Sequence, residues 1–305
     1  MGAGAGHGYT AATKMGGGSG LSAPVSDYSI YRKVVTQLMN GEEQLPSLPM
    51  ITLDIRRALA DPNVTVVRLK QVISKDPALS ALLMKHASSI MFRSSTPPRT
   101  LEDVIRLLGL QEVDRITLVH SLKSLFTLHS AAHKQLFIGV WERLTRQAAI
   151  SAVLARPLGL PSPDHALLAS LLCDVGELAM LSAFKDASQV PGPDVYARLC
   201  REYGKSLSVI VLQKWAVDQG YIDIVRSARQ WEADSGGRFG LIDLVNLGLY
   251  HALRAEGRVA QLPPIDQLVA YRKLAPPLDA LDASGGLALA SAQQDAIQRM
   301  ASLLR

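Results

Sequence analysis

Apolar residues recur every three or four positions along most of this chain, which is the spacing of one face of an α-helix. Thr65, Asp76 and Thr100 each precede such a run, and their side chains can accept hydrogen bonds from the free amides of a first helical turn. No segment alternates apolar and polar residues over the length of a strand. The pattern therefore predicts an all-α fold made of many short helices.

A second series of helices is predicted beyond residue 135. The expected helices span residues 136–154, 167–184, 195–203, 207–215, 222–231 and 239–253. Pro157 ends the first of them, and Asp174 and Gly176 interrupt the second. The first series is expected to form one lobe and the second series another.

The pattern divides the chain into three parts. Residues 1–27 are rich in Gly, Ala and Ser and are expected to form a flexible tail. Residues 28–256 form the helical body, with one lobe over about 28–134 and a second over about 135–256. Residues 257–305 contain two Pro-Pro pairs and a Gly-Gly pair before a last apolar-periodic stretch, which predicts a linker and a C-terminal helical appendage. That appendage is a candidate docking or dimerisation element.

The composition indicates a globular cytoplasmic protein. Hydrophobic residues make up 48% of the 305 positions and charged residues 19%, enough to bury a large core. No apolar run is long enough to span a membrane, and no signal peptide is expected. The net charge of +5 is scattered among acidic residues and aromatic residues are only 5%, so no nucleic-acid partner is expected. Two cysteines, Cys173 and Cys200, are too few for a disulfide framework.

Three motifs follow one another in the first lobe. They are Leu-Pro-Ser-Leu-Pro at 45–49, Ile-Ser-Lys-Asp-Pro-Ala-Leu at 73–79, and Thr-Leu-Glu-Asp-Val-Ile-Arg-Leu-Leu-Gly at 100–109. In this order and spacing they closely resemble the N-terminal lobe of HDOD domains, which are relatives of the HD phosphohydrolases. The resemblance continues to about residue 231. It implies an N-terminal helical lobe packed on an HD-like helical lobe.

An HD hydrolase uses bound metal ions to activate water against a phosphate ester. The resemblance implies histidine and aspartate ligands for those metals at four places in the second lobe. Here Arg143 stands at the first place, and Cys173 replaces the histidine of the His-Asp pair, while Asp174 is retained. Gly204 aligns with a further histidine, and Arg-Gln-Trp at 229–231 aligns with a His-His helix end. None of the seven histidines of the chain falls at these positions.

These replacements predict a degenerate site without metal, cofactor or catalysis. Arg143 brings a permanent positive charge, and one carboxylate with one thiol does not make a two-metal centre. Two arrangements remain open for Asp174: an ion pair with Arg143, or a cap of the turn before Gly176. Arg143 could alternatively hold a phosphate or nucleotide. Cys173, in an apolar helix, is expected to be inert.

The resemblance implies a non-catalytic regulatory module of bacterial signal transduction, in motility, stress, biofilm or cyclic-dinucleotide pathways. The expected partner is a signalling protein, for example a diguanylate cyclase, a receiver domain or a kinase, bound on the helical surface or between the lobes. One alternative is a sensor that binds a small anionic ligand, such as a nucleotide, in the remodelled pocket. Another is a residual metal-dependent phosphohydrolase. The oligomeric state stays open.

The remaining polar candidates are interpreted as structural. His129 and His133 have the spacing of two ligands on one helix face, but no glutamate base lies between them, so both are expected on the surface. His86 and His120 lie on apolar helix faces and are expected to be core histidines. Four arginines are expected on solvated helix faces: Arg56, Arg57, Arg226 and Arg229.

Overall fold

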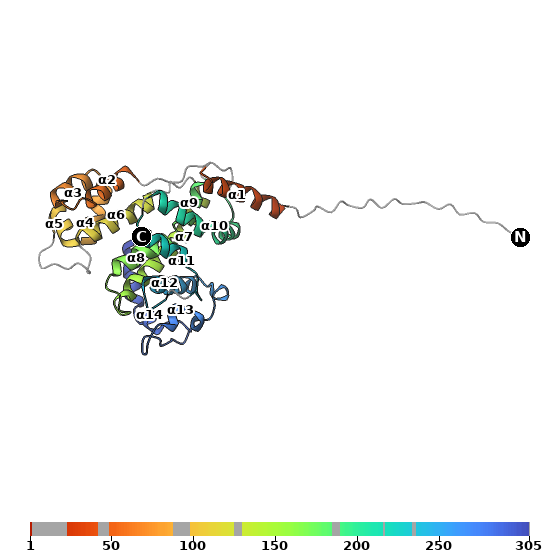
Figure 1. The fold of residues 1–305 in the computed structure, drawn as a ribbon. Helices are drawn as coiled ribbons and strands as arrows, with labels where there is room; N and C mark the ends of the chain where they lie inside the picture. The colour runs from red at the N-terminus through yellow and green to blue at the C-terminus, as the bar shows by residue number, and fades with distance from the viewer. Residues whose placement is uncertain are drawn as a thin grey trace.

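The computed structural model describes residue 1 and residues 23–41, 49–87, 98–124, 130–184, 190–215, 217–233 and 236–304. Across these ranges the regular structure is helical, apart from one isolated bridge between Leu281 and Leu287, and the all-α prediction is confirmed (Figure 1). Most of the predicted tail over residues 1–27 lies outside the described residues, as does the Leu-Pro motif before Pro49.

Five helices form the N-terminal lobe around a core of their own (Figure 1). They are α2 (Met50–Leu59), α3 (Val66–Ile73), α4 (Pro77–Ala87), α5 (Leu101–Leu108) and α6 (Leu110–Ser124). Each helix turns an apolar face inward, so that Ile55, Leu69 and Leu83 are shielded from solvent. The N-terminal lobe is therefore a packed unit with its own hydrophobic core.

The predicted helix starts in this lobe are confirmed at three positions. The Thr65 hydroxyl accepts a hydrogen bond from an amide in the first turn of α3. The Asp76 carboxylate accepts one from the Leu79 amide at 2.9 Å, and Thr100 and Asp103 form a reciprocal capping box. These contacts satisfy amides that have no partner within their own helices. The boundaries of these helices therefore follow from local sequence.

The larger lobe is built around α7 (Ala131–Ala155), a helix of 25 residues. Its other main helices are α8 (Pro163–Cys173), α9 (Val175–Ser182), α10 (Pro193–Lys214), α11 (Gln219–Ser227) and α12 (Leu241–Ala255). Helices α8, α9 and α12 all contact α7, while α10 packs on α9 and α11 packs on α10. Because α7 is buried along most of its length, it is the central element of the fold.

Helix α1 (Ala23–Met39) packs on the larger lobe, although the sequence placed it with the N-terminal lobe. Its Val35 and Leu38 are buried in the larger core. Arg32 Nε also donates a hydrogen bond to the Tyr203 hydroxyl of α10 at 2.7 Å. The sequence assigned α1 to the wrong lobe because the spacing of apolar residues within one helix does not show contacts with residues 171 positions away.

The last fifty residues complete the larger lobe, whereas the sequence predicted a linker and an appendage over 257–305. Their elements are η2 (Val259–Gln261), η3 (Ile265–Gln267), α13 (Val269–Arg272), α14 (Ala288–Ala292) and α15 (Gln294–Leu304). The predicted terminal helix is present as α15, which packs along α7 and buries Ile297, Met300 and Leu304. The segment is therefore part of the core, because its apolar face is covered within the same chain.

Helices α9 and α10 cross closely at two glycines. A β-carbon on Gly176 would lie 2.3 Å from the Gly204 carbonyl oxygen, so only glycine permits this approach. The Ser208 hydroxyl accepts a hydrogen bond from the Gly176 amide at 2.8 Å and donates one to the Gly204 carbonyl at 3.0 Å. The sequence predicted separate helices over 195–203 and 207–215. Instead α10 runs unbroken through Gly204, because the crossing needs a continuous helix backbone there.

No single helix among the described residues is long and apolar enough to cross a membrane. The segments His165–Cys173 and Val175–Ser182 meet the length and composition criterion only as a pair, bent by 42°. At that bend, Leu171, Leu172 and Val175 are buried in the larger core of this structure.

Replacing Gly176 with alanine is expected to destabilise the protein by about 2–3 kcal/mol or more, because the added methyl group overlaps the α10 backbone. Gly139→Ala is the matched control, since nothing lies within 4 Å of a β-carbon at that position of α7. It should be neutral or stabilising by up to about 1 kcal/mol. Urea denaturation followed by circular dichroism measures both changes. Similar stabilities for the two variants would contradict the close crossing.

Candidate functional site

The retained aspartate lies at the bend between α8 and α9. Helix α8 ends at Cys173 and α9 begins at Val175, so Asp174 is the hinge residue between them. Its side chain makes no capping hydrogen bond to α9. Its carboxylate instead faces α7, where Arg143 Nη2 lies 3.6 Å from Asp174 Oδ2. Of the two predicted arrangements, the structure contains the ion pair.

Arg143 projects from the middle of α7 into a group of three carboxylates. Its side chain is only 3% exposed. Nη2 donates a hydrogen bond to Glu177 Oε2 at 2.5 Å, which makes Glu177 a closer partner than Asp174. Nη1 lies 4.0 Å from Glu256 Oε1, just beyond the end of α12. A guanidinium buried to this degree requires such partners, because an unpaired charge in the core is very costly.

A second arginine enters the same cluster from the turn after α11. Arg229 Nη2 donates hydrogen bonds to Asp174 Oδ2 at 2.7 Å and to Glu177 Oε1 at 3.3 Å. The expectation of a solvated helix position is wrong for this residue, because α11 ends at Ser227 and the chain turns inward. The Arg229 backbone is left-handed, with φ of 66°, and its amide donates to Asn246 Oδ1 at 2.9 Å. That bond helps to hold a conformation that non-glycine residues seldom adopt.

The two arginines keep the buried aspartate ionised. Burial raises the pKa of the Asp174 carboxyl, but the charges of Arg229 and Arg143 outweigh burial and leave that pKa below its usual value. Burial also raises the pKa of the neighbouring Cys173 thiol, with a further contribution from the Asp174 charge. The site therefore holds a carboxylate and a neutral thiol, and not a thiolate ligand.

The four site residues predicted from the sequence have different places in this arrangement. Arg143 and Asp174 form an ion pair. Gly204 lies against Glu177, where a β-carbon would come within 3.1 Å of Glu177 Cγ, so the glycine makes room for that side chain. Cys173 is buried immediately before the hinge, as expected for an inert cysteine.

Sequence reasoning missed three members of the cluster: Glu177, Arg229 and Glu256. A signal was present for Glu177, which follows Asp174 by three residues and so shares a helix face with it. A signal was also present for Arg229, because it aligns with a family histidine just as Arg143 does. No signal marked Glu256, whose place near Arg143 depends on how α12 packs against α7.

The cluster opens into a cleft with a volume of about 530 Å³. Its charged lining consists of Arg143, Arg146, Arg201, Arg229, Arg258, Glu142, Glu177 and Glu256. Arg258 pairs with Glu256 at 3.1 Å. Arg146 and Arg201 have neither a hydrogen bond nor an ion pair with the residues that the structure describes. In this cleft, the charges of the buried cluster are therefore paired with one another, whereas Arg146 and Arg201 are not paired with a described residue.

The predicted histidine positions are partly wrong. His133 is buried, and its ring nitrogens lie 2.9 Å from Ser130 Oγ and 3.2 Å from the Phe184 carbonyl, so the surface prediction fails for it. His129 lies outside the described residues. His86 is buried, as predicted, and burial lowers its pKa to about 4. The imidazole of His86 is therefore neutral at physiological pH.

The other polar candidates are close to the surface. The side chains of Arg57 and Arg226 are exposed, which confirms their solvated positions. Arg56 is half-buried and donates to a backbone carbonyl of the larger lobe, so the solvated interpretation is wrong for it. His120 lies 3.5 Å from the Asp76 carboxylate and is 23% exposed, so it is not a core residue.

The model of the HDOD domain matches residues 45–230 of this chain. The chain belongs to the HDOD family. It is also 24% identical over 211 residues to an uncharacterized protein of Treponema pallidum (strain Nichols), a match that covers 64% of this chain. The chain spans only 39% of the length of that curated relative.

Two crystal structures share the fold over nearly the whole HDOD chain. A candidate metal-dependent phosphohydrolase from Shewanella amazonensis SB2B superposes with a TM-score of 0.72 and 16% identity, covering 92% of this chain and 100% of its own. An HDOD domain protein with unknown function from Geobacter sulfurreducens gives a TM-score of 0.59 and 16% identity, covering 90% and 97%. At these identities the similarity shows the fold alone. That fold includes the two lobes expected from the sequence motifs.

The residues of this HDOD protein do not fit the metal centre of an HD hydrolase. Asp174 Oδ2 and both Glu177 side-chain oxygens are already within ion-pair distance of an arginine. A divalent cation between these carboxylates would lie beside two permanent positive charges. In the described part of the chain, no three His, Cys, Asp or Glu side chains are grouped as metal ligands would be.

Replacing Arg143 with methionine is expected to lower the free energy of unfolding by about 3–5 kcal/mol at neutral pH, because it leaves buried carboxylates with one partner fewer. Arg201→Met removes the same charge from an exposed position of the cleft lining and should change stability by less than about 0.5 kcal/mol. Urea denaturation at pH 7 measures both. Equal effects of the two substitutions would mean that the cluster contributes no specific stability.

The cost of Arg143→Met is also expected to depend on pH. In the wild type, the lowered pKa of Asp174 contributes stability above the unfolded carboxyl pKa of about 3.9, and this contribution is lost as the pH falls through the folded value. In the variant, the loss of the Arg143 charge raises the folded pKa of Asp174. The difference in stability should therefore shrink between pH 8 and about pH 5. A difference that stays constant would argue against ionised carboxylates in the cluster.

Proposed function

We propose that this HDOD protein is a non-catalytic regulatory module of bacterial signal transduction that acts by binding another protein. The observation that carries the proposal is the cluster of Arg143, Arg229, Asp174 and Glu177. Two arginine side chains occupy the region where an HD hydrolase would bind metal ions, and their charges satisfy the carboxylates. A fold that keeps its two lobes while its metal-binding region is filled by ion pairs suits recognition better than hydrolysis.

The proposed partner is a cytoplasmic signalling protein, such as a diguanylate cyclase, a receiver domain or a kinase. The lining of the cleft supports a protein-binding role, because the 43% exposed Ile138 of α7 lines it together with the unpaired cations Arg146 and Arg201. Exposed apolar residues and arginines are both common in protein–protein interfaces. A partner with an apolar side chain flanked by carboxylates matches this surface.

The geometry supports the two alternatives less well. A sensor that holds its anion on Arg143 must compete with three carboxylates that already face this guanidinium. In that case Arg143→Ala should abolish the thermal shift produced by a nucleotide. A residual phosphohydrolase would need a metal bound by Asp174 in spite of the two arginines. In that case Asp174→Ala should remove activity that the wild type has.

The purified protein is expected to show no metal-dependent phosphodiesterase activity. Bis(p-nitrophenyl) phosphate is a suitable substrate, assayed with added manganese or iron, and metal content is measured on the same samples. Wild type and Asp174→Ala should both give the background rate, because the aspartate acts in an ion pair and not on a metal. Stoichiometric metal, together with activity that Asp174→Ala abolishes, would contradict the non-catalytic function.

Partner binding is expected to depend on the exposed apolar residue of the cleft. Full-length protein is tested against purified candidates from the three signalling classes by biolayer interferometry. Ile138→Asp should weaken binding at least about tenfold, since it replaces the apolar anchor of the proposed interface with a charge. Leu110→Asp is the control, because Leu110 is 40% exposed but lies in the N-terminal lobe. If both variants lose the same affinity, or if Ile138→Asp loses none, the partner binds outside this cleft.

A further inference from the structure

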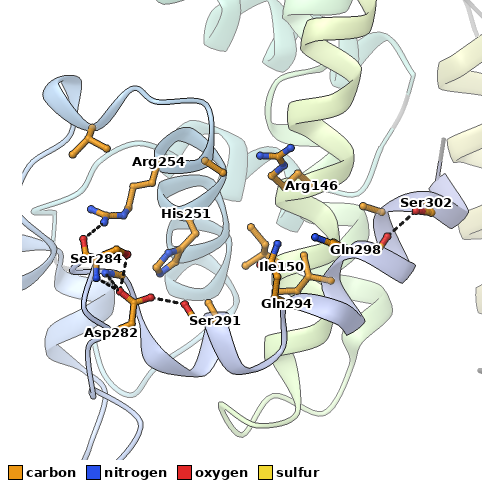
Figure 2. Close-up of a pocket in the computed structure, with 16 residues that line it drawn as sticks. Arg146, Ile150, His251, Arg254, Asp282, Ser284, Ser291, Gln294, Gln298 and Ser302 are labelled. Carbon is orange, nitrogen blue, oxygen red and sulfur yellow. Dashed lines mark hydrogen bonds between the residues drawn. The ribbon is translucent and has the colours of Figure 1, made fainter.

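A second groove lies between α7, α12 and the C-terminal helices α14 and α15 (Figure 2). Its volume is about 830 Å³, within the range of about 300–1,000 Å³ that is usual for small-molecule sites. Arg146 comes from α7, His251 and Arg254 come from α12, and Gln298 comes from α15 (Figure 2). Because α15 forms one wall, the groove exists only when the C-terminal segment is packed on the larger lobe.

One buried polar atom in this groove has no partner within the chain. The Nε2 atom of His251 is shielded from solvent and has no hydrogen bond with any described residue. Burial, with a smaller contribution from the charge of Arg254, lowers the pKa of His251 to about 4, although the charge of Asp282 acts in the opposite direction. The ring is therefore neutral at physiological pH and carries one donor and one acceptor nitrogen. A buried polar atom without a partner is unfavourable, so a bound molecule that reaches it would gain a hydrogen bond.

The charges of the groove favour an anion as that partner. The carboxylate of Asp282 already accepts hydrogen bonds from Ser284, Gly286 and Ser291, so it is occupied within its own loop. Arg254 donates to the Ser284 carbonyl at 2.5 Å. Arg146, by contrast, has no hydrogen bond or ion pair with the described residues. The groove thus holds a guanidinium that is available to a ligand.

The remaining lining is mostly apolar or uncharged. Ile150 of α7 and Ile297 of α15, which are 5% and 4% exposed, border the groove together with the exposed Val259 and several small residues. Gln294 and Gln298 provide amide groups along α15. The groove therefore has one unpaired cation, Arg146, among apolar, amide and hydroxyl groups, while Arg254 and Asp282 are held by contacts with the loop at Ser284. Such a surface complements a molecule with one anionic group and an apolar or planar body.

We propose that this groove binds a small organic anion, whose phosphate or carboxylate group is held by Arg146 and whose body lies against the groove wall formed by α7 and α15. His251 Nε2 supplies a hydrogen bond to the bound molecule. The site is separate from the arginine–carboxylate cluster, although Arg146 lines both cavities. Because Arg146 is also one of the two cations of the proposed partner surface, the variants below include Arg201→Gln, which alters that surface alone.

The first test uses 8-anilinonaphthalene-1-sulfonate, a fluorescent dye that joins an anionic group to an apolar planar body. Its affinity for the full-length protein should fall at least about tenfold in Arg146→Gln, as expected when a charge-assisted hydrogen bond is lost. Arg201→Gln, in the first cleft alone, and Arg299→Gln, on the exposed side of α15, should each stay within about twofold of wild type. Undiminished affinity in Arg146→Gln, or an equal loss in Arg299→Gln, overturns the proposal.

Displacement of the dye identifies the anionic group of the natural ligand. Adenosine monophosphate carries a phosphate group, and octanoate carries a carboxylate. If either compound displaces the dye from wild type, but not the dye that still binds to Arg146→Gln, the groove is supported as a site for organic anions. Displacement by neither compound contradicts the proposal.

The second test separates ligand binding from a structural role of His251. Leucine has a similar volume to histidine and removes the unpaired nitrogen, so His251→Leu should leave the Tm unchanged or raise it. The same variant should bind the dye about tenfold more weakly, because the hydrogen bond to the ligand is lost. A lower Tm, or full affinity in His251→Leu, would show that the imidazole serves the fold and not a ligand.

Discussion

The central constraint in this protein is that two carboxylates, Asp174 and Glu177, lie within a helical core and need positive partners there. An isolated ionised carboxylate in such a setting carries a large desolvation penalty. Arg143 and Arg229 meet that need with contacts of 2.5 and 2.7 Å. The bend between α8 and α9, the glycine crossing of α9 with α10, and the left-handed turn after α11 all contribute to bringing these four side chains together.

Much of the fold could be predicted because its signals are local. Thr65, Asp76 and Thr100 cap their helices through contacts within four residues, and apolar periodicity marks the faces that turn inward. The packing of α1 on the larger lobe, the unbroken course of α10 through Gly204, and the burial of α15 could not be predicted in this way. Each depends on contacts between segments far apart in the chain.

The site was predictable only where a family position could be matched to a residue. Matching placed Arg143 opposite Asp174, and the structure contains that ion pair. The same matching gave a position for Arg229, but its helical spacing favoured a surface interpretation, and only the left-handed backbone turns the side chain inward. Glu256 and the groove beside His251 depend on how α12, α7 and α15 pack together. The spacing of residues within one segment cannot predict how separate helices pack.

In the proposed function, the two arginines take the place that metal ions hold in an HD hydrolase: they neutralise the carboxylates and activate no water for hydrolysis. The measurement that tests this most directly is a crystal structure of the full-length protein grown with excess manganese, with anomalous data collected near the manganese absorption edge. We expect no anomalous peak beside Asp174 and Glu177, with both guanidinium groups in contact with these carboxylates. A strong peak between the two carboxylates, with Arg143 and Arg229 displaced from them, would contradict it.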